Sequence, residues 1–367
     1  MKAKDPNKMQ LLGLMSGTSL DGLDIALVEF EFEAHQYPDF HIVNAFTFNY
    51  PAPLLKALKI ATTLPGEQLF KLNHDLGLYY AECIHSFCVK FNIDADKITA
   101  IASHGQTIFH QPELGFTTQI GCGVTLNYHT KIPVINDFRT LDVVAGGQGA
   151  PLVPIGDALL FAGQADGFLN LGGFANISTQ INGTHQAYDI APANLPLNLW
   201  MREIGKEYDE NGIVARNGKV QQQIVMQVLK LNYFTQEGPK SLGTEWMHTH
   251  YLTHFEGLDL ADKLRTHVEI LSILTAQECQ KLGLQKVMVT GGGAFNSLLI
   301  EVLRQKFTGM LVVPDEKIVA FKEALIFAFL GARFIQNQTT TIASVTGARE
   351  QLCTGTLHDY QRKLLKL

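Results

Sequence analysis

The sequence predicts an α/β protein made of two similar halves. The chain has 367 residues, more than the roughly 250–300 residues at which one hydrophobic core usually divides into domains. The first half begins with the pattern of a β-hairpin with a turn of small residues, followed by a third strand, helices, and a strand that runs into polar residues. The second half repeats this succession. Because the offset is too long for a solenoid, we predict a duplicated α/β domain.

The first half contains an expected hairpin whose turn, residues 16–22, consists mainly of small and polar residues. Apolar residues from Leu76 to Phe91 recur at the spacing of a helix. A later strand leads directly into residues 103–107, Ser-His-Gly-Gln-Thr. The strands expected in this half lie at 11–15, 23–30, 41–48, 98–102 and 134–138.

The second half follows the glycine-rich stretch 145–151 and has the same order of elements. Two expected strands flank Gly172 and Gly173, and a third ends at Asp189. Gly283 suits the end of a helix over 268–282, and Asn296 can cap the next helix. The elements expected in this half are strands at 168–171, 175–179, 286–290 and 311–313, and helices at 195–204, 268–282, 298–307 and 321–334.

We place the domain boundary in the stretch near 139–150. Residues 1–138 would form an N-terminal lobe and residues 139–351 a C-terminal lobe. The last segment, 352–367, could pack back on the N-terminal lobe or stay with the other one.

Composition points to a globular protein that handles small molecules. Hydrophobic residues make up 46% and charged residues 17%, and the net charge is −6. Without a run of Lys or Arg, the chain is not expected to bind nucleic acid or a membrane surface. No apolar run approaches the roughly 18 residues of a membrane span. The five cysteines contain no Cys-x-x-Cys pair, which favours reduced thiols and a cytoplasmic location.

Two common phosphate-binding motifs are absent, the P-loop and the dinucleotide fingerprint Gly-x-Gly-x-x-Gly after a strand. The turn 16–22, Ser-Gly-Thr-Ser-Leu-Asp-Gly, is a candidate for another device. Its amides and hydroxyls could surround phosphate oxygens, and Asp21 could hold Mg²⁺ directly or through water. Taken alone, the segment is explained better as an ordinary polar hairpin turn.

Two further segments lie where ligands bind in α/β sheets, beyond the carboxyl ends of strands. The glycines at 291–293 would let a flat ligand approach the backbone, and the helix that follows favours an anion at its N-terminus. A tight strand-to-helix turn explains them equally well. His104 and Gln106 could bind sugar hydroxyls, but ordinary hydrogen bonding within a loop explains them too.

Asp189 is a candidate general base because it stands near a strand end, followed by Ile-Ala-Pro-Ala-Asn. A helix cap or a turn is the alternative role for this carboxylate. The spacing of His248, His250 and His254 is similar to that of metal ligands. With no carboxylate in register, a solvated or structural role is favoured for these histidines.

Taken in order, the segments resemble one enzyme family, the anhydro-N-acetylmuramic acid kinases, which share the actin, hexokinase and Hsp70 ATPase (ribonuclease H-like) fold. The matching segments are residues 13–22, 103–108, 119–121, 137–139, 142, 145–154, 170–176, 238–241, 291–296, 323 and 345–347. Each segment is weak by itself, and their number and order over nearly the whole chain make the resemblance specific.

The resemblance implies two duplicated actin/hexokinase-like lobes with a central ligand cleft. It also implies a reaction in which 1,6-anhydro-N-acetylmuramic acid, ATP and water give N-acetylmuramic acid 6-phosphate and ADP. Asp189 would take the proton of the water that attacks C1, and the released O6 would accept the γ-phosphoryl group. Asp21 would act with Mg²⁺. The resemblance further suggests a homodimer.

The same resemblance assigns binding roles to individual residues. Those implied for the nucleotide are Ser16, Gly17, Thr18, Ser19, Asp21, Gly22, Gly172, Gly173, Gly291, Gly292, Gly293 and Asn296. Those implied for the sugar are His104, Gln106, Thr107, Arg139, Asp142, Gln148, Asn194 and Glu323.

One segment departs from the family pattern Phe-Asp-x-Gly-Pro-Gly-Asn, because residues 188–194 read Tyr-Asp-Ile-Ala-Pro-Ala-Asn. Alanine at 191 and 193 restricts positive φ and adds methyl groups beside the expected base. Three alternatives therefore stay open: a kinase for another 1,6-anhydrosugar such as levoglucosan, a non-catalytic nucleotide or sugar sensor, and an actin-like scaffold.

Overall fold

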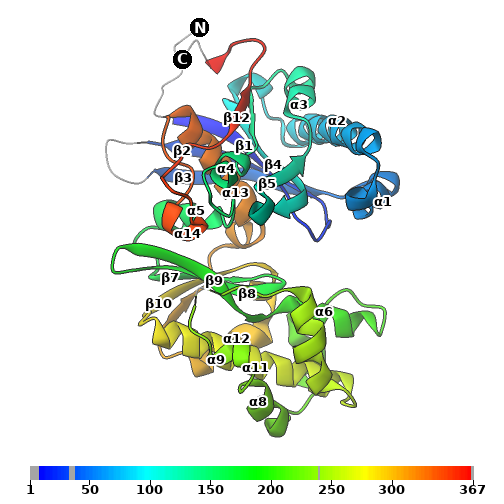
Figure 1. Cartoon of the computed structure of the whole chain (residues 1–367), viewed down its shortest axis with the longest axis vertical. Helices are drawn as coiled ribbons and strands as arrows, with labels where there is room; N and C mark the ends of the chain where they lie inside the picture. Colours follow the sequence, from blue (N-terminus) through cyan, green and yellow to red (C-terminus); the bar gives the residue numbers. More distant parts are fainter. Residues whose placement is uncertain (1–7, 33–37, 239, 365–367) are drawn as a thin grey trace. The chain divides into compact units, whose positions relative to one another are not determined.

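The computed structural model describes residues 8–32, 38–238 and 240–364. Contacts divide the chain into two compact α/β units (Figure 1). The first unit comprises residues up to Leu160 together with those from Phe321 onward, and the second comprises residues 161–320. Among the described residues, no helix is both long and apolar enough to cross a membrane.

The first unit is built on a mixed sheet with the strand order β12-β6-β4-β1-β2-β3. The strands β1, β2 and β3 form an antiparallel meander, whereas β4 runs parallel to β1, and β6 parallel to β4. The short β5 pairs with the far part of β4. The strands are β1 (Lys8–Ser16), β2 (Leu23–Glu31), β3 (Asp39–Phe48), β4 (Ala100–Gln111), β5 (Phe116–Ile120), β6 (Val134–Asn136) and β12 (Thr356–His358).

The second unit repeats this topology with the strand order β11-β10-β7-β8-β9. Here β7, β8 and β9 form the antiparallel meander, β10 runs parallel to β7, and β11 parallel to β10. The strands are β7 (Gly167–Leu171), β8 (Phe174–Ile181), β9 (Thr184–Pro192), β10 (Lys286–Thr290) and β11 (Met310–Val312). The predicted duplicated α/β fold is therefore confirmed by the strand order itself.

Helices complete each unit, and their ends follow local signals. Gly283 takes the left-handed conformation just after α11, with φ of 70°, and the Asn296 side chain caps α12 by accepting from the Leu299 amide at 3.1 Å. The α-helices are α1 (Ala52–Lys59), α2 (Gly66–Phe91), α3 (Gly123–Thr130), α4 (Thr140–Val144), α5 (Val153–Leu160), α6 (Asn194–Arg202), α7 (Ile213–Arg216), α8 (Gln222–Val228), α9 (Asn232–Thr235), α10 (Thr244–Trp246), α11 (Leu260–Lys281), α12 (Ser297–Lys306), α13 (Glu316–Ile335) and α14 (Ala343–Thr346).

The boundary between the units differs from the predicted position near 139–150. Residues 139–160 belong to the first unit because buried polar contacts join them to its C-terminal part. The fully buried Asp142 accepts from the Thr346 hydroxyl and the Gly149 amide, both at 2.8 Å. Lys322 and Asp157 form a buried ion pair at 2.6 Å. These contacts join segments far apart in the sequence, which no local composition change reveals.

The C-terminal segment packs back on the first unit, as one of the two expectations had it. Strand β12 pairs antiparallel with β6, from Thr356 opposite Asn136 to His358 opposite Val134. Residues 365–367 lie outside the described part of the chain. The first unit thus takes its last edge strand from the end of the sequence.

The sheet of the first unit is buried on both faces, which explains its almost continuous apolar strands. Leu12 and Leu14 of β1 belong to one core with the inward face of α2. On the other face, Gly13 lies against α13: a Cβ at Gly13 would come within 1.8 Å of the Ala324 carbonyl oxygen. Helix α13 can pack this closely only because position 13 has no side chain.

We predict that Gly13→Ala destabilises the protein strongly. The added methyl meets backbone atoms of α13 that cannot move aside, so the free energy of unfolding should fall by about 3 kcal/mol or more. Chemical unfolding followed by circular dichroism measures the change. Gly66→Ala is the matched control, because nothing lies within 4 Å of a Cβ at that position. Equal stability of the two variants would contradict the packing argument.

Candidate functional site

Asp189 lies near the end of β9, in the second unit, and hydrogen bonds fix it from several sides. Its Oδ2 accepts from the Leu242 amide at 2.9 Å and from the Ser241 hydroxyl at 3.4 Å. Its own amide donates to the Lys240 carbonyl at 3.0 Å, and its carbonyl accepts from the Tyr233 hydroxyl at 2.8 Å. Among the described residues, none donates to Oδ1. The carboxylate is therefore held rigidly, with one oxygen left for a ligand.

The surroundings of Asp189 also change its acidity. Burial raises the pKa of this carboxyl above its ordinary 3.8, while the Leu242 amide and the Ser241 hydroxyl act to lower it. A carboxylate with a raised pKa is a stronger base than one in water. Geometry and electrostatics both suit a general base.

A β-bulge directs the Asp189 side chain. Asp189 pairs with Asn176, whereas Ala191 pairs with Ala175, so that Ile190 is an extra residue on β9. Bulges bend a strand and re-aim side chains, and they are frequent beside active sites. Sequence reasoning missed this bulge, because the apolar pattern of β9 carries no mark of it.

The segment from Asp189 to Asn194 comprises the end of β9, Ala193 and the first residue of α6, and we call it the Asp189–Asn194 loop. It connects the base to the turn at Gly172 and Gly173. The Ala193 amide donates to the Gly173 carbonyl at 2.9 Å, and the Asn194 amide donates to the Gly172 carbonyl at 3.1 Å. The Asn194 side chain donates to the Leu171 carbonyl at 2.9 Å. The first residues of α6 therefore hold the β7–β8 turn in place.

The departures from the family pattern, Ala191 and Ala193, occupy positions of this loop that do not have positive φ. Neither Ala191 nor Ala193 is among the residues with positive φ, and both methyl groups are buried in the core of the second unit. The hydroxyl of Tyr188, which stands where the family has Phe, donates to Glu278 Oε1 at 2.7 Å. The expected disturbance of the site by these alanines therefore does not arise from a need for positive φ.

The glycines at 291–293 meet β7 where β10 ends, because β7 and β10 run parallel. A Cβ at Gly291 would come within 2.4 Å of Asn170 Oδ1, and one at Gly293 within 2.7 Å of the Leu171 side chain. Gly292 has more room, because a Cβ at this position would lie 3.5 Å from its nearest neighbour, Asn194 Nδ2. The structure thus brings together both glycine turns and Asn194 at one edge of the sheet. Asn296 lies beside them, but its side chain is used to cap α12.

In the first unit, the start of the turn 16–22 is held by buried hydrogen bonds. The Ser16 hydroxyl bonds to Tyr50 at 2.5 Å and also donates to Gln106 Oε1. Thr18, Ser19 and Asp21 are exposed. The exposed part of the turn remains open to a ligand, whereas the Ser16 and Gln106 side chains bond to each other.

His104 is a buried neutral imidazole in this network. Its Nε2 accepts from Nε and Nη2 of Arg139, both at 3.0 Å. Nδ1 must then carry the hydrogen, which points to the Ser16 carbonyl at 3.4 Å. Burial and the charge of Arg139 lower the pKa of His104 to about 3. Both ring nitrogens are thus engaged within the unit.

The other predicted sugar-binding residues of the first unit differ in accessibility. Arg139 also donates to the Gly149 carbonyl at 2.6 Å, and both oxygens of Asp142 accept hydrogen bonds, from Thr346 and Gly149. Thr107 accepts from Gln119 at 3.3 Å. Gln148 and Glu323 are exposed.

The turn 16–22 fits Mg²⁺ in one respect that the structure shows. Burial raises the pKa of Asp24, and the negative charge of nearby Asp21 raises it further; a cation would relieve this repulsion. In the described part of the chain, no three His, Cys, Asp or Glu side chains form a metal cluster, so an ion here would keep several waters, as Mg²⁺ commonly does. His248, His250 and His254 likewise do not form a metal cluster in the described part of the chain.

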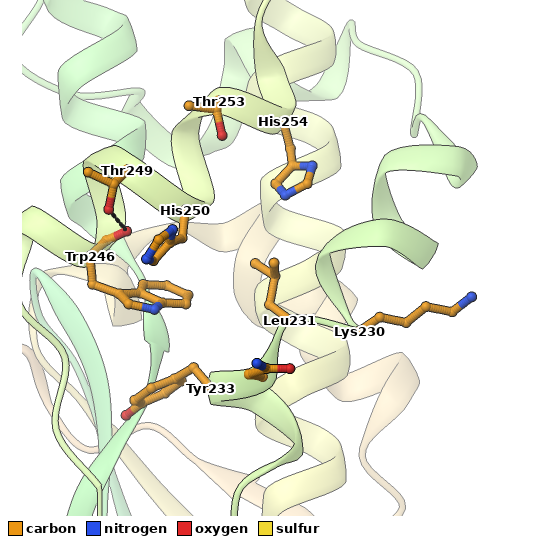
Figure 2. A pocket seen from close by; sticks show the side chains of 9 residues that line it. Lys230, Leu231, Tyr233, Trp246, Thr249, His250, Thr253 and His254 are labelled. Atoms are coloured by element: carbon orange, nitrogen blue, oxygen red, sulfur yellow. Dashed lines mark hydrogen bonds between the residues drawn. The ribbon is translucent and has the colours of Figure 1, made fainter.

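A pocket of about 490 Å³ lies in the second unit, between residues 230–233 and residues 246–254 (Figure 2). Tyr233 forms part of its wall and reaches the Asp189 carbonyl with its hydroxyl. Trp246 lies edge-on to His250, with 5.8 Å between the ring centroids. The lining residues are Lys230, Leu231, Asn232, Tyr233, Trp246, Thr249, His250, Thr253 and His254. Sequence reasoning missed Tyr233, because nothing in its local sequence indicates a contact with β9.

Comparison with known proteins identifies the family. A family model described as anhydro-N-acetylmuramic acid kinase matches residues 9–360. The chain belongs to this family. The protein is therefore a sugar kinase, and the family and enzyme class expected from the sequence are confirmed.

Curated relatives of the same name agree with this assignment. The anhydro-N-acetylmuramic acid kinase of Shewanella oneidensis is 36% identical over 370 residues, covering 95% of this chain and 98% of that protein. That of Shewanella sp. strain ANA-3 is also 36% identical, over 376 residues and with the same coverage.

Among solved structures, the chain is similar to the activator of 2-hydroxyisocaproyl-CoA dehydratase from Clostridium difficile with bound ADPNP. The two are 15% identical, with a TM-score of 0.44, and the match covers 90% of this chain and 97% of that one.

We predict that buried His267 of α11 makes the second unit less stable in mild acid. Its folded pKa is lowered to about 4 from an ordinary 6.5 because it is wholly buried. Below pH 6.5 the unfolded chain therefore binds a proton that the folded chain does not. The free energy of unfolding should fall by about 2 kcal/mol between pH 6.5 and 5 from this group.

Tryptophan fluorescence during urea unfolding measures this effect, because both tryptophans, Trp200 and Trp246, lie in the second unit. His267→Gln removes the ionisable group. Between pH 6.5 and 5, the free energy of unfolding of this variant should therefore fall by about 2 kcal/mol less than that of the wild type. The same pH slope in both proteins would contradict the prediction.

Proposed function

We propose that the protein converts 1,6-anhydro-N-acetylmuramic acid, ATP and water to N-acetylmuramic acid 6-phosphate and ADP. Asp189 takes a proton from water as the water oxygen bonds to C1, and the C1–O6 bond breaks. O6 then bonds to the γ-phosphorus of ATP, and ADP leaves. The observation that carries this proposal is the position of Asp189, fixed by Leu242 and Ser241, with no donor to Oδ1 among the residues that the structure describes.

We assign the binding roles by which side chains the fold leaves available. Thr18, Ser19 and Asp21 are exposed on their turn and suit phosphate oxygens, together with the amides of Gly17 and Gly22. The turns at Gly172–Gly173 and Gly291–Gly293 would hold phosphate and nucleoside. Exposed Gln148 and Glu323 of the first unit suit the sugar directly. Thr107 of the same unit and Asn194 of the second unit, both partly buried, suit it as well. Ser16, His104, Gln106, Arg139, Asp142 and Asn296 would instead shape the site through the hydrogen bonds described above.

We propose Mg²⁺ as the metal, held by Asp21 through water or directly, with Asp24 nearby. Mg²⁺ supplies positive charge that offsets the phosphate oxygens. Five free cysteines support a reducing, cytoplasmic environment. The homodimer that the family resemblance suggests remains part of this proposal.

The substrate is tested by ADP release with Mg-ATP and, in parallel, 1,6-anhydro-N-acetylmuramic acid, levoglucosan and N-acetylmuramic acid. Turnover with the first alone is expected. Turnover with levoglucosan alone would retain the mechanism and change the sugar. Binding of ATP without turnover of any sugar would favour a sensor.

Asp189→Asn should lower kcat by roughly 10²–10⁴-fold, the usual contribution of a general base. The amide keeps the size of the side chain and can still accept from Leu242, so the melting temperature and ATP affinity should stay near the wild-type values. Glu256→Gln, an exposed carboxylate of the same unit, is the control and should retain full rate. A wild-type rate in Asp189→Asn would exclude Asp189 as the base.

Asp21→Ala should raise the Mg²⁺ concentration needed for half-maximal rate several-fold, because a carboxylate ligand or a water partner of the ion is lost. The rate at saturating Mg²⁺ should fall less than in Asp189→Asn. Titration of the rate with MgCl₂ at fixed ATP measures both values. An unchanged half-maximal Mg²⁺ concentration would contradict the role of Asp21.

A further inference from the structure

His267 is a buried histidine of α11 for which neither the sequence nor the family resemblance provides a role. Its side chain is 0% exposed. Nε2 lies 2.8 Å from the Ala193 carbonyl oxygen, and Nδ1 lies 2.7 Å from the Tyr251 hydroxyl. A carbonyl oxygen can only accept, so Nε2 carries the hydrogen and Nδ1 accepts from Tyr251. These two contacts specify one neutral tautomer.

The carbonyl that His267 holds belongs to the loop after Asp189. The Ala193 amide donates to the Gly173 carbonyl at 2.9 Å, while the Ala193 carbonyl accepts from His267. Ala193 is thus hydrogen-bonded through its amide to the β7–β8 turn and through its carbonyl to α11. Asp189 precedes it by four residues, and Asn194 follows it directly. A displacement of Ala193 would therefore shift both the Asp189 carboxylate and the turn at Gly172 and Gly173.

The histidine ring is itself held rigidly. Tyr251 is fully buried at the end of a π-helical turn, Met247–Tyr251; such turns occur frequently at functional sites. The ring of Trp200 lies edge-on to His267, with 5.8 Å between the centroids, and the ring of Phe255 lies 4.8 Å from that of Trp200. The aromatic contacts restrict the plane of the imidazole, and its two hydrogen bonds place Nε2 toward the loop.

We propose that His267 is a positioning residue for the ring-opening step: through the Ala193 carbonyl it holds the Asp189–Asn194 loop so that the Asp189 carboxylate and the Gly172–Gly173 turn keep their relative placement. The inference rests on the proposed role of Asp189 as the base. Tyr251 acts behind His267 by fixing its tautomer. Both side chains are fully buried, so we assign neither of them a contact with substrate.

The test compares two substitutions of His267 in the full-length protein. His267→Phe keeps a flat ring but leaves the Ala193 carbonyl without its donor. Since a displacement of about 1 Å can cost roughly 10²-fold in rate, kcat should fall roughly ten- to a hundredfold, with the KM for ATP changed much less. His267→Gln can still donate an amide hydrogen and should recover most of the rate. His358→Phe, which removes a partly buried histidine bonded to Asn136 at 2.9 Å in the other unit, is the matched control for loss of a histidine hydrogen bond.

The outcomes separate this inference from the proposed function. A folded His267→Phe with wild-type kcat, beside an inactive Asp189→Asn, would overturn the positioning role and leave the base in place. Wild-type activity in Asp189→Asn would overturn both. A fall in kcat in His267→Phe that His267→Gln restores, with similar melting temperatures for the two variants, would support the inference.

Two measurements keep the inference falsifiable if His267→Phe does not fold. Tyr251→Phe keeps the aromatic packing and removes only the hydroxyl, and it should lower kcat several-fold; an unchanged kcat would count against the chain from Tyr251 to Ala193. Nitrogen-15 NMR of the wild-type histidine rings should show His267 protonated at Nε2 alone between pH 6 and 8. Protonation at Nδ1 instead would overturn the proposed hydrogen bond.

Discussion

Parallel pairing of two strands determines where the candidate site lies within each unit. In the first unit β4 runs parallel to β1, and in the second β10 runs parallel to β7. The turn that follows β1 or β7 and the polar or glycine-rich segment at the end of its partner therefore share one edge of the sheet. Residues separated by more than 100 positions, such as Asn170 and Gly291, meet for this reason.

Buried backbone carbonyls impose a second constraint, because each needs a donor. In both units a neutral histidine supplies such a hydrogen-bond donor close to the candidate site. His104 faces the Ser16 carbonyl at the start of the turn 16–22, and His267 faces the Ala193 carbonyl in the loop after Asp189. Each ring accepts from a second side chain, Arg139 or Tyr251, which selects the tautomer. Since burial lowers both pKa values to about 3 and about 4, these rings keep their hydrogen bonds unchanged near neutral pH.

The loop after Asp189 shows how sequence departures can leave a site intact. Alanine replaces glycine at 191 and 193, yet neither position requires positive φ, and both methyl groups enter the core of the second unit. Tyr188 adds a hydroxyl, which donates a hydrogen bond to the Glu278 carboxylate. The alanines therefore require no positive φ beside the base, and the hydrogen bonds of Leu242 and Ser241 to Asp189 are kept. This weakens the argument for a non-catalytic sensor.

The sequence by itself determined the duplicated α/β fold, the succession of similar elements in its two halves and the family. Alternating and helical apolar patterns, together with glycines at turns, are local properties, and they predicted the hairpins and the Asn296 cap. They also predicted the strand that contains Asp189, which continues three residues beyond the predicted end, to Pro192. The tertiary structure alone decided the boundary between the units, the bulge at Ile190, and the partners of Asp142, His104 and His267. Three of those contacts, His104 with Arg139, His267 with Ala193 and Asp142 with Thr346, join residues 35, 74 and 204 positions apart. No local pattern encodes them, because a hydrogen bond depends on where the folded backbone places its two atoms.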